Sequence, residues 1–245
     1  MFKSFPKIDK NEVNPLENFS CNNFSGKKSI SISPAYKLID LKRIYKKFNG
    51  GTLNDLCLCL ISRALESWKR DRKEECKSIT GIFGVNIRTT IEPTELGNYS
   101  QGRIINLRSS ENFNESMESI IKSTTELKRK EMLIASLPLM TAISKYLMNE
   151  DLLMKSFGDM NKKIPFIFTN VQGPKDHVIL KNTEAKVNDI FVIVPHGSLS
   201  FSIVLFSYAG EIRFAFNTDR ASETPIDQFC NYLAKEIEEN LKLII

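Results

Sequence analysis

The chain has 245 residues, of which 42% are hydrophobic and 26% are charged, a composition typical of a soluble globular protein. A chain of this length buries enough apolar surface to fold without disulfides or a structural metal. Its 34 Lys and Arg residues and 29 Asp and Glu residues give a net charge of +5, spread over scattered basic pairs. Such pairs are typical of solvated helix faces, and they also suit a surface that attracts anionic lipid or phosphate groups. No nucleic-acid partner is expected.

The sequence shows neither a secretory signal nor a membrane-spanning helix. The N-terminal residues, Met1 to Lys7, have no apolar segment of the kind that a signal peptide needs. No apolar run approaches the about 20 residues that span a bilayer. We therefore expect a protein that is cytoplasmic or peripheral to a membrane.

The cysteines predict neither disulfides nor a metal site. They are Cys21, Cys57, Cys59, Cys76 and Cys230. Their number is odd and no spacing fits a metal site, so we expect free thiols in a reducing compartment. No metal and no bound cofactor are expected.

The first third of the chain predicts an N-terminal segment followed by two helices. Residues 1–30 are rich in Asn, Ser and Lys without periodicity, and they predict an arm or linker before one domain over residues 31–245. Apolar residues at helical spacing between Leu41 and Phe48 predict the first helix. Thr52-Leu-Asn-Asp55 is a capping box, and it opens the clearest amphipathic helix of the sequence.

The middle third predicts two strands and then helices. Residues 79–88 and 103–107 favour strands, and either Asn112 or Asn114 could cap the helix that follows. Residues 131–160 are rich in Met and Leu and predict helix. This methionine-rich stretch fits either core filling or the lining of an acyl-chain site, and the sequence leaves both open.

The last third is rich in strand signals. The expected strands are 165–171, 184–194, 199–208 and 211–218. The last two form a hairpin turned at Ala209-Gly210, and Thr224-Pro-Ile-Asp227 predicts the start of the final helix, with the proline at its first position. This order of elements predicts an α/β two-layer sandwich with a mixed, largely antiparallel sheet.

Only two histidines could act as a base, and neither has a catalytic context. His177 lies in a polar loop and fits a solvated surface residue. His196 enters a turn before a buried strand, close in sequence to Ser198 and Ser200, so a nucleophile–base pair can be imagined. The strand–Gly-x-Ser-x-Gly–helix context of such a nucleophile is missing, and a turn role for His196 is favoured. No catalytic residue is assigned, and His196 is the one candidate.

Five short motifs lie in order along most of the chain, and they are Asn54-Asp55, Gly97-Asn98, Asn170-Val-Gln-Gly173-Pro174, Ser207-Tyr-Ala-Gly210 and Asp219. Together these motifs resemble the C-terminal half of the wax ester synthase/diacylglycerol acyltransferase family. Gln172 stands where the family usually has proline. Asp55 also has a purely structural explanation as the capping residue of its helix.

The resemblance implies half of a coenzyme A-dependent acyltransferase fold, with acyl-CoA as co-substrate. It implies O-acyl transfer to an alcohol or to diacylglycerol, in wax ester or triacylglycerol synthesis. The family's base is a histidine in a His-His-x-x-x-Asp-Gly motif, which these residues do not contain. We therefore expect a partnership with an N-terminal acyltransferase half or self-association. The alternative is a non-catalytic domain that binds lipid or a partner. The groove candidates are Asn54, Asp55, Gly97, Asn98, Asn170, Gly173 and Pro174.

Overall fold

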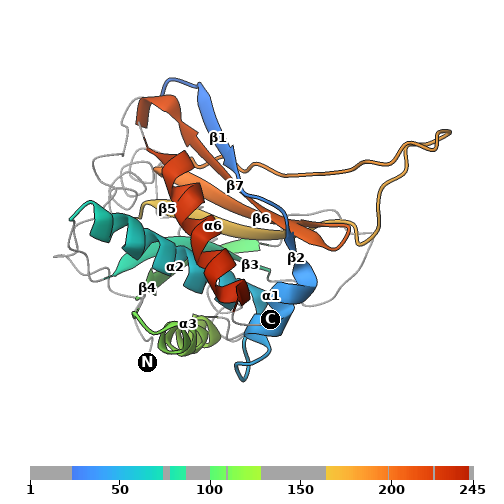
Figure 1. Ribbon diagram of the computed structural model, residues 1–245. Helices are drawn as coiled ribbons and strands as arrows, with labels where there is room; N and C mark the ends of the chain where they lie inside the picture. Colours follow the sequence, from blue (N-terminus) through green and yellow to red (C-terminus); the bar gives the residue numbers. More distant parts are fainter. Residues whose placement is uncertain are drawn as a thin grey trace, which may run out of the picture.

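The computed structural model describes residues 24–73, 78–86, 100–108, 110–127, 164–197, 199–222 and 224–242. Seven strands form one sheet in the order β1-β7-β6-β5-β3-β4, and β2 also pairs with β7 (Figure 1). The strands are β1 (Lys28–Ile32), β2 (Tyr36–Lys37), β3 (Ile79–Asn86), β4 (Ser100–Leu107), β5 (Phe166–Gln172), β6 (Phe201–Tyr208) and β7 (Glu211–Asp219). Strand β5 runs parallel to β3 and β6, and the other pairs are antiparallel.

Helices cover one face of this sheet (Figure 1). They are α1 (Leu38–Tyr45), α2 (Leu53–Asp71), α3 (Phe113–Leu127) and α6 (Ile226–Lys242), with a short 3₁₀ helix η3 (Arg220–Ser222) after β7. Helix α2 contacts α1, α3 and α6, so it lies at the centre of the helical layer. The expected two-layer α/β sandwich with a mixed, largely antiparallel sheet is confirmed.

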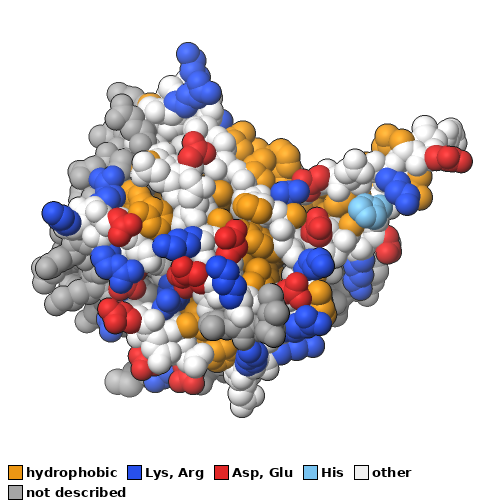
Figure 2. Space-filling view, in the orientation of Figure 1, with side chains coloured by type: hydrophobic (Ala, Val, Ile, Leu, Met, Phe, Trp, Pro, Cys, Tyr) orange, Lys and Arg blue, Asp and Glu red, His pale blue; other side chains and the backbone are white. Residues whose placement is uncertain are grey.

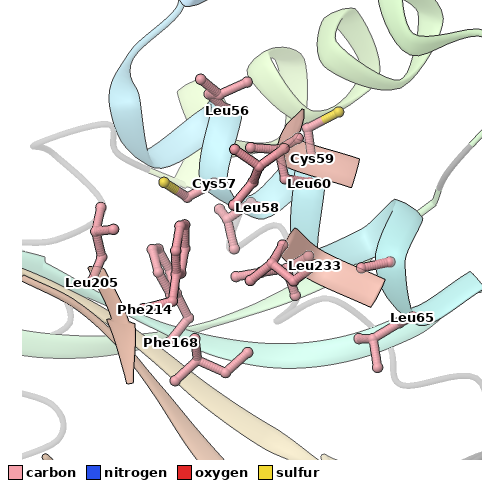
Figure 3. Packing of buried hydrophobic residues seen from close by; sticks show 14 of the residues in the cluster. Leu56, Cys57, Leu58, Cys59, Leu60, Leu65, Phe168, Leu205, Phe214 and Leu233 are labelled. Atoms are coloured by element: carbon pink, nitrogen blue, oxygen red, sulfur yellow. The ribbon is translucent and has the colours of Figure 1, made fainter. Parts of the chain in front are cut away.

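The core lies between α2 and the sheet. Cys57 and Leu58 of α2 point toward the sheet, where Phe168, Leu205 and Phe214 belong to three adjacent strands (Figure 3). The sequence pattern places the apolar residues of α2 on one face, but Leu58 and Cys59 are buried as well. They are buried because neighbouring helices flank α2, and a helix covered on several sides buries more than one stripe.

Local signals give most of the helix and turn boundaries correctly. The Ala209-Gly210 turn has positive φ at both residues, 47° and 83°, as a two-residue hairpin requires. Asn112 caps α3, because its side chain accepts a hydrogen bond from the Asn114 backbone N–H at 2.9 Å. The expectation for the final helix was wrong in detail. Helix α6 begins at Ile226, and the Thr224 hydroxyl hydrogen-bonds to the Ser222 hydroxyl at 2.9 Å.

Two further expectations differ from the structure. Strand β1 begins at Lys28, inside the stretch expected to be an arm, because it pairs with β7. The strand expected over 184–194 was wrong, since only an isolated bridge joins Ile179 and Lys186 there. This segment does not join the sheet, so its β-branched residues have no ladder to form. The methionine-rich stretch 131–160 lies outside the described residues.

Candidate functional site

The N-terminus of α2 is fixed by a carboxylate with both oxygens engaged. Asp55 Oδ2 accepts hydrogen bonds from the Thr52 backbone N–H at 2.8 Å and from the Thr52 hydroxyl at 2.6 Å, which completes the expected capping box. Asp55 Oδ1 accepts a hydrogen bond from the Thr124 hydroxyl of α3 at 2.6 Å. Asp55 is 1% exposed, so its carboxylate anchors the helix start and is not open to a ligand.

Asn54 and Asn170 lie side by side. Asn170 Nδ2 donates a hydrogen bond to Asn54 Oδ1 at 2.8 Å, across 116 residues of sequence. The pair joins the first turn of α2 to the end of β5 at the surface, as expected if the two segments border one groove. Among the described residues, Asn54 Nδ2 and Asn170 Oδ1 make no protein hydrogen bond. The pair therefore offers the Asn54 NH₂ group as a donor and the Asn170 side-chain oxygen as an acceptor to a ligand.

The turn after β5 is held against the β6–β7 hairpin. The Gly173 backbone N–H donates to the Ser207 carbonyl at 2.9 Å, and Ala209 N–H donates to the Pro174 carbonyl at 3.0 Å. A Cβ atom at Gly173 would lie 2.3 Å from the Ser207 carbonyl oxygen, so only glycine fits this close approach. Gly173 and Pro174 thus fix where β5 ends, and with it the position of Asn170.

The site contains polar side chains without a base. Gly97 and Asn98 fall outside the described residues. Amide side chains orient a ligand but do not take up a proton near neutral pH. A small cavity of about 10 Å³ behind Leu65, Trp68 and Phe229 has room for no more than a water molecule, so it does not house an acyl chain.

His196 has both ring nitrogens occupied and no hydroxyl partner among the described residues. Nδ1 donates to the Leu199 carbonyl at 2.9 Å, and Nε2 accepts from the Lys28 ammonium at 3.3 Å. Burial is the main cause that lowers the pKa of His196 below its ordinary value of 6.5, and Lys28 lowers it further. The Leu199 carbonyl and Asp219 oppose this shift. The imagined pairing with Ser200 is not formed, because the buried Ser200 hydroxyl has no partner. The Ser198 side chain is outside the described residues.

Asp219 is a buried carboxylate beside His196, and the sequence did not indicate how many contacts it makes. Asp219, at the end of β7, accepts hydrogen bonds from the Ser25 backbone and hydroxyl and from the Gly26 and Ala221 backbones. Its carboxylate also lies 3.6 Å from the Lys28 ammonium. Burial would raise the pKa of Asp219, but the hydrogen bonds outweigh it and hold that pKa well below its usual range. No local pattern marks the contacts with Ser25 and Gly26, since these partners lie more than 190 residues away in sequence.

The described residues contain no cluster of three or more His, Cys, Asp or Glu side chains that could bind a metal ion. Within the same ranges, no helix is both long and apolar enough to cross a membrane. Cys57, Cys59 and Cys230 are free and buried. Burial is the main cause that raises the pKa of each of these thiols. These cysteines therefore act as small apolar core residues.

The sequence comparison decides the family. The model of the WS/DGAT C-terminal domain matches residues 96–240, which is more than half of the chain. This chain belongs to the WS/DGAT C-terminal domain family. The resemblance inferred from the five motifs is confirmed. A search of curated proteins finds no match.

Solved structures show the same fold at low sequence identity. The wax ester synthase/diacylglycerol acyltransferase from Marinobacter aquaeolei VT8 has a TM-score of 0.59 and 14% identity, over 93% of this chain and 51% of that one. The epimerization domain from the third module of tyrocidine synthetase B has a TM-score of 0.58 and 11% identity, over 88% and 48%. PapA2 acyl transferase has a TM-score of 0.55 and 8% identity, over 90% and 46%.

These similarities show that the fold is that of coenzyme A-dependent acyltransferases and condensation-type domains. At such identities they show the fold alone. This chain spans about half the length of the solved structures that it matches.

Proposed function

We propose that this chain is the C-terminal half of an O-acyltransferase that uses acyl-CoA to esterify an alcohol or diacylglycerol. The catalytic histidine comes from an N-terminal half. The observation that carries the proposal is the hydrogen bond between Asn54 and Asn170, which joins the start of α2 to the end of β5 at the surface. The strand β5 lies within the residues that match the WS/DGAT C-terminal domain. The asparagine pair offers hydrogen-bonding groups and no base, as expected of one wall of a shared site.

The proposed reaction is acyl transfer by general-base catalysis. The histidine of the N-terminal half takes the proton of the acceptor hydroxyl, and the oxygen attacks the thioester carbon. The C–S bond breaks, and the coenzyme A thiolate leaves and is protonated. The Asn54 amide N–H group can stabilise the oxygen that becomes negative in between, and the Asn170 carbonyl oxygen can orient the acceptor hydroxyl.

The test compares the chain alone with the chain supplied with an N-terminal half that carries His-His-x-x-x-Asp-Gly. Ester product is measured by mass spectrometry, which detects the product itself. The chain alone is expected to form no ester, and the pair is expected to form it. Ester from the chain alone that survives loss of both His177 and His196 would overturn the proposal.

Substitutions at the asparagine pair test the site itself. Asn54→Ala and Asn170→Ala are each expected to lower kcat/KM by about fivefold or more, since each removes an orienting hydrogen bond worth about 1 kcal/mol or more. Asn114→Ala is the matched control, because Asn114 is an exposed asparagine on α3. Equal activity of all three variants would remove the asparagine pair from the site.

The second candidate is a non-catalytic domain that binds lipid or a partner. It is favoured by the histidines, since both nitrogens of His196 are occupied and His177 is exposed with Nδ1 3.3 Å from the Val187 carbonyl. This function predicts saturable binding of a fluorescent acyl-CoA with no ester formed, even when an N-terminal half is present. Ester formation by the pair excludes it.

A further inference from the structure

Strand β1 lies at the rim of the sheet with one side open. It pairs with β7, and no other described strand lies beyond it (Figure 1). Just past its end, Ser33 N–H donates to the Phe214 carbonyl at 2.9 Å, so the odd-numbered residues face β7. Because the direction of the backbone groups alternates along an antiparallel strand, those of Lys28, Ile30 and Ile32 point to the open side.

The side chains of β1 place its apolar residues on the surface. Ser29 and Ser31 turn toward α6, where the Ser31 hydroxyl hydrogen-bonds to the Cys230 thiol. Ile30 and Ile32 lie on the opposite face and are 46% and 37% exposed. Figure 2 shows hydrophobic side chains along the rim where β1 lies. Open backbone groups and apolar side chains on one edge strand indicate a surface for pairing with another strand.

The usual protections of an edge strand are absent from β1 itself. Natural edge strands are protected from pairing by charges, prolines or bulges. Lys28 is the one charged residue of β1, and it lies at the start of the strand. Its ammonium is held 3.6 Å from the Asp219 carboxylate and 3.3 Å from His196 Nε2. Pro34 lies two residues beyond the end of the strand. Residues 28–32 are therefore left open to another strand.

The sequence of β1 fits a second copy of itself. We propose that two copies of this chain associate by antiparallel pairing of their β1 strands, which joins the two sheets into one. A two-fold axis at Ile30 places Ile30 opposite Ile30 of the second copy, and Ile32 opposite Lys28. All three positions have their backbone groups on the open side, so each opposed pair exchanges two hydrogen bonds. The isoleucines of both copies then form one apolar strip on the same face.

Charge and the position of α6 select a second copy in the antiparallel direction. The Lys28 residues of the two copies lie four positions apart along the strands, about 14 Å, which exceeds the Debye length of about 8 Å. A parallel pair would place the two ammonium groups side by side. Helix α6 contacts β1, so α6 of the second copy comes alongside and enlarges the interface beyond the strands. An unrelated extended peptide gains no such helix contact.

This association leaves the candidate site uncovered. Strands β6 and β7 separate β1 from β5, which carries Asn170. The proposal therefore does not depend on the proposed function, and either can fail without the other.

The experiment measures self-association by sedimentation velocity between about 1 and 500 µM, since pairing of a short strand gives a weak interface. The unchanged chain is expected to form a dimer. Ile30→Lys and Ile30→Glu should each raise the dissociation constant at least about tenfold, because each places like charges opposite one another. An equimolar mixture of the two variants pairs opposite charges and should associate at least about tenfold more tightly than either alone.

Ile39→Lys is the matched control, because Ile39 on α1 is 56% exposed, and it should associate as the unchanged chain does. Equal melting temperatures show that the variants fold. An unchanged chain that stays monomeric up to about 500 µM overturns the proposal. A dimer that Ile30→Lys does not weaken forms through another surface and also overturns it. A mixture that associates no better than the single variants shows that Ile30 does not face Ile30, and the antiparallel pairing is then wrong.

Discussion

The carboxylate of Asp55 is expected to stabilise the fold by holding α2 and α3 together. Asp55→Ala removes the capping box, which is worth about 1 kcal/mol. It also leaves the fully buried Thr124 hydroxyl without its carboxylate acceptor, at a cost of about 1–3 kcal/mol. The lower part of that range applies, because the Thr124 hydroxyl also lies 3.1 Å from the Ile121 carbonyl. The free energy of unfolding should therefore fall by about 2–3 kcal/mol.

Urea unfolding of four proteins measures this: the unchanged chain, Asp55→Ala, Thr124→Val and the double variant. Thr124→Val removes the hydroxyl and keeps the side-chain volume, so Asp55 keeps its bonds to Thr52. The two changes should be coupled by about 0.5–2 kcal/mol, since the residues share one hydrogen bond. Asn114→Ala, on the exposed face of α3, should change the free energy of unfolding by less than about 0.5 kcal/mol.

The refuting results are equally specific. If Asp55→Ala costs less than about 1 kcal/mol, or the double variant shows no coupling, the carboxylate does not anchor α2 as described. If ester formation with an N-terminal half falls sharply while stability is unchanged, Asp55 acts on the substrate. The geometry argues against this second result, because both of its oxygens are already engaged.

Two other perturbations test the surroundings of the site. Gly173→Ala should cost about 2–3 kcal/mol in urea unfolding, since its Cβ would press on the Ser207 carbonyl, whereas Gly84→Ala, with its nearest neighbour at 3.4 Å, should cost less than about 1 kcal/mol. Equal losses of unfolding free energy in the two variants would show that the turn after β5 shifts to make room for a Cβ atom at Gly173. The second perturbation is pH. The folded state lowers the pKa of His196 below 6.5, so the unfolded chain binds the proton more readily. Stability should be complete above about pH 6.5 and should decline as the pH falls through the lower, folded pKa. His196→Gln should flatten that decline in melting temperature between about pH 7 and pH 5, and an unchanged slope would assign the decline to other groups.

Sequence could predict the elements whose signals are local. The capping box at Thr52 and Asp55 lies within four residues and needs no tertiary contact to be recognised. The Ala209-Gly210 turn and the alternation of β7 are equally local. Sequence could not predict that Thr124 completes the capping site, because the fold alone brings α3 against α2.

The error over residues 184–194 has a physical cause. Strand propensity describes how well side chains fit a pleated, half-buried surface, and it does not say which surface. The segment contains Ile190, Phe191, Val192 and Ile193, which favour a strand, yet it forms no ladder with the sheet of this chain.

The asparagine pair shows where resemblance succeeds and pattern reading fails. Asn54 and Asn170 were selected by similarity to family motifs, and no rule of spacing connects residues 116 positions apart. Their contact depends on the parallel placement of β5 beside β6, together with the close approach that Gly173 permits. Strand β5 positions Asn170, and the start of α2 positions Asn54. The hydrogen bond between the two side chains therefore needs both segments in place. A change at Gly173 and a change at Asp55 should therefore affect the same two amides through different elements. Their effects on ester formation should then be smaller in combination than the product of the single effects, because either one already separates Asn54 from Asn170.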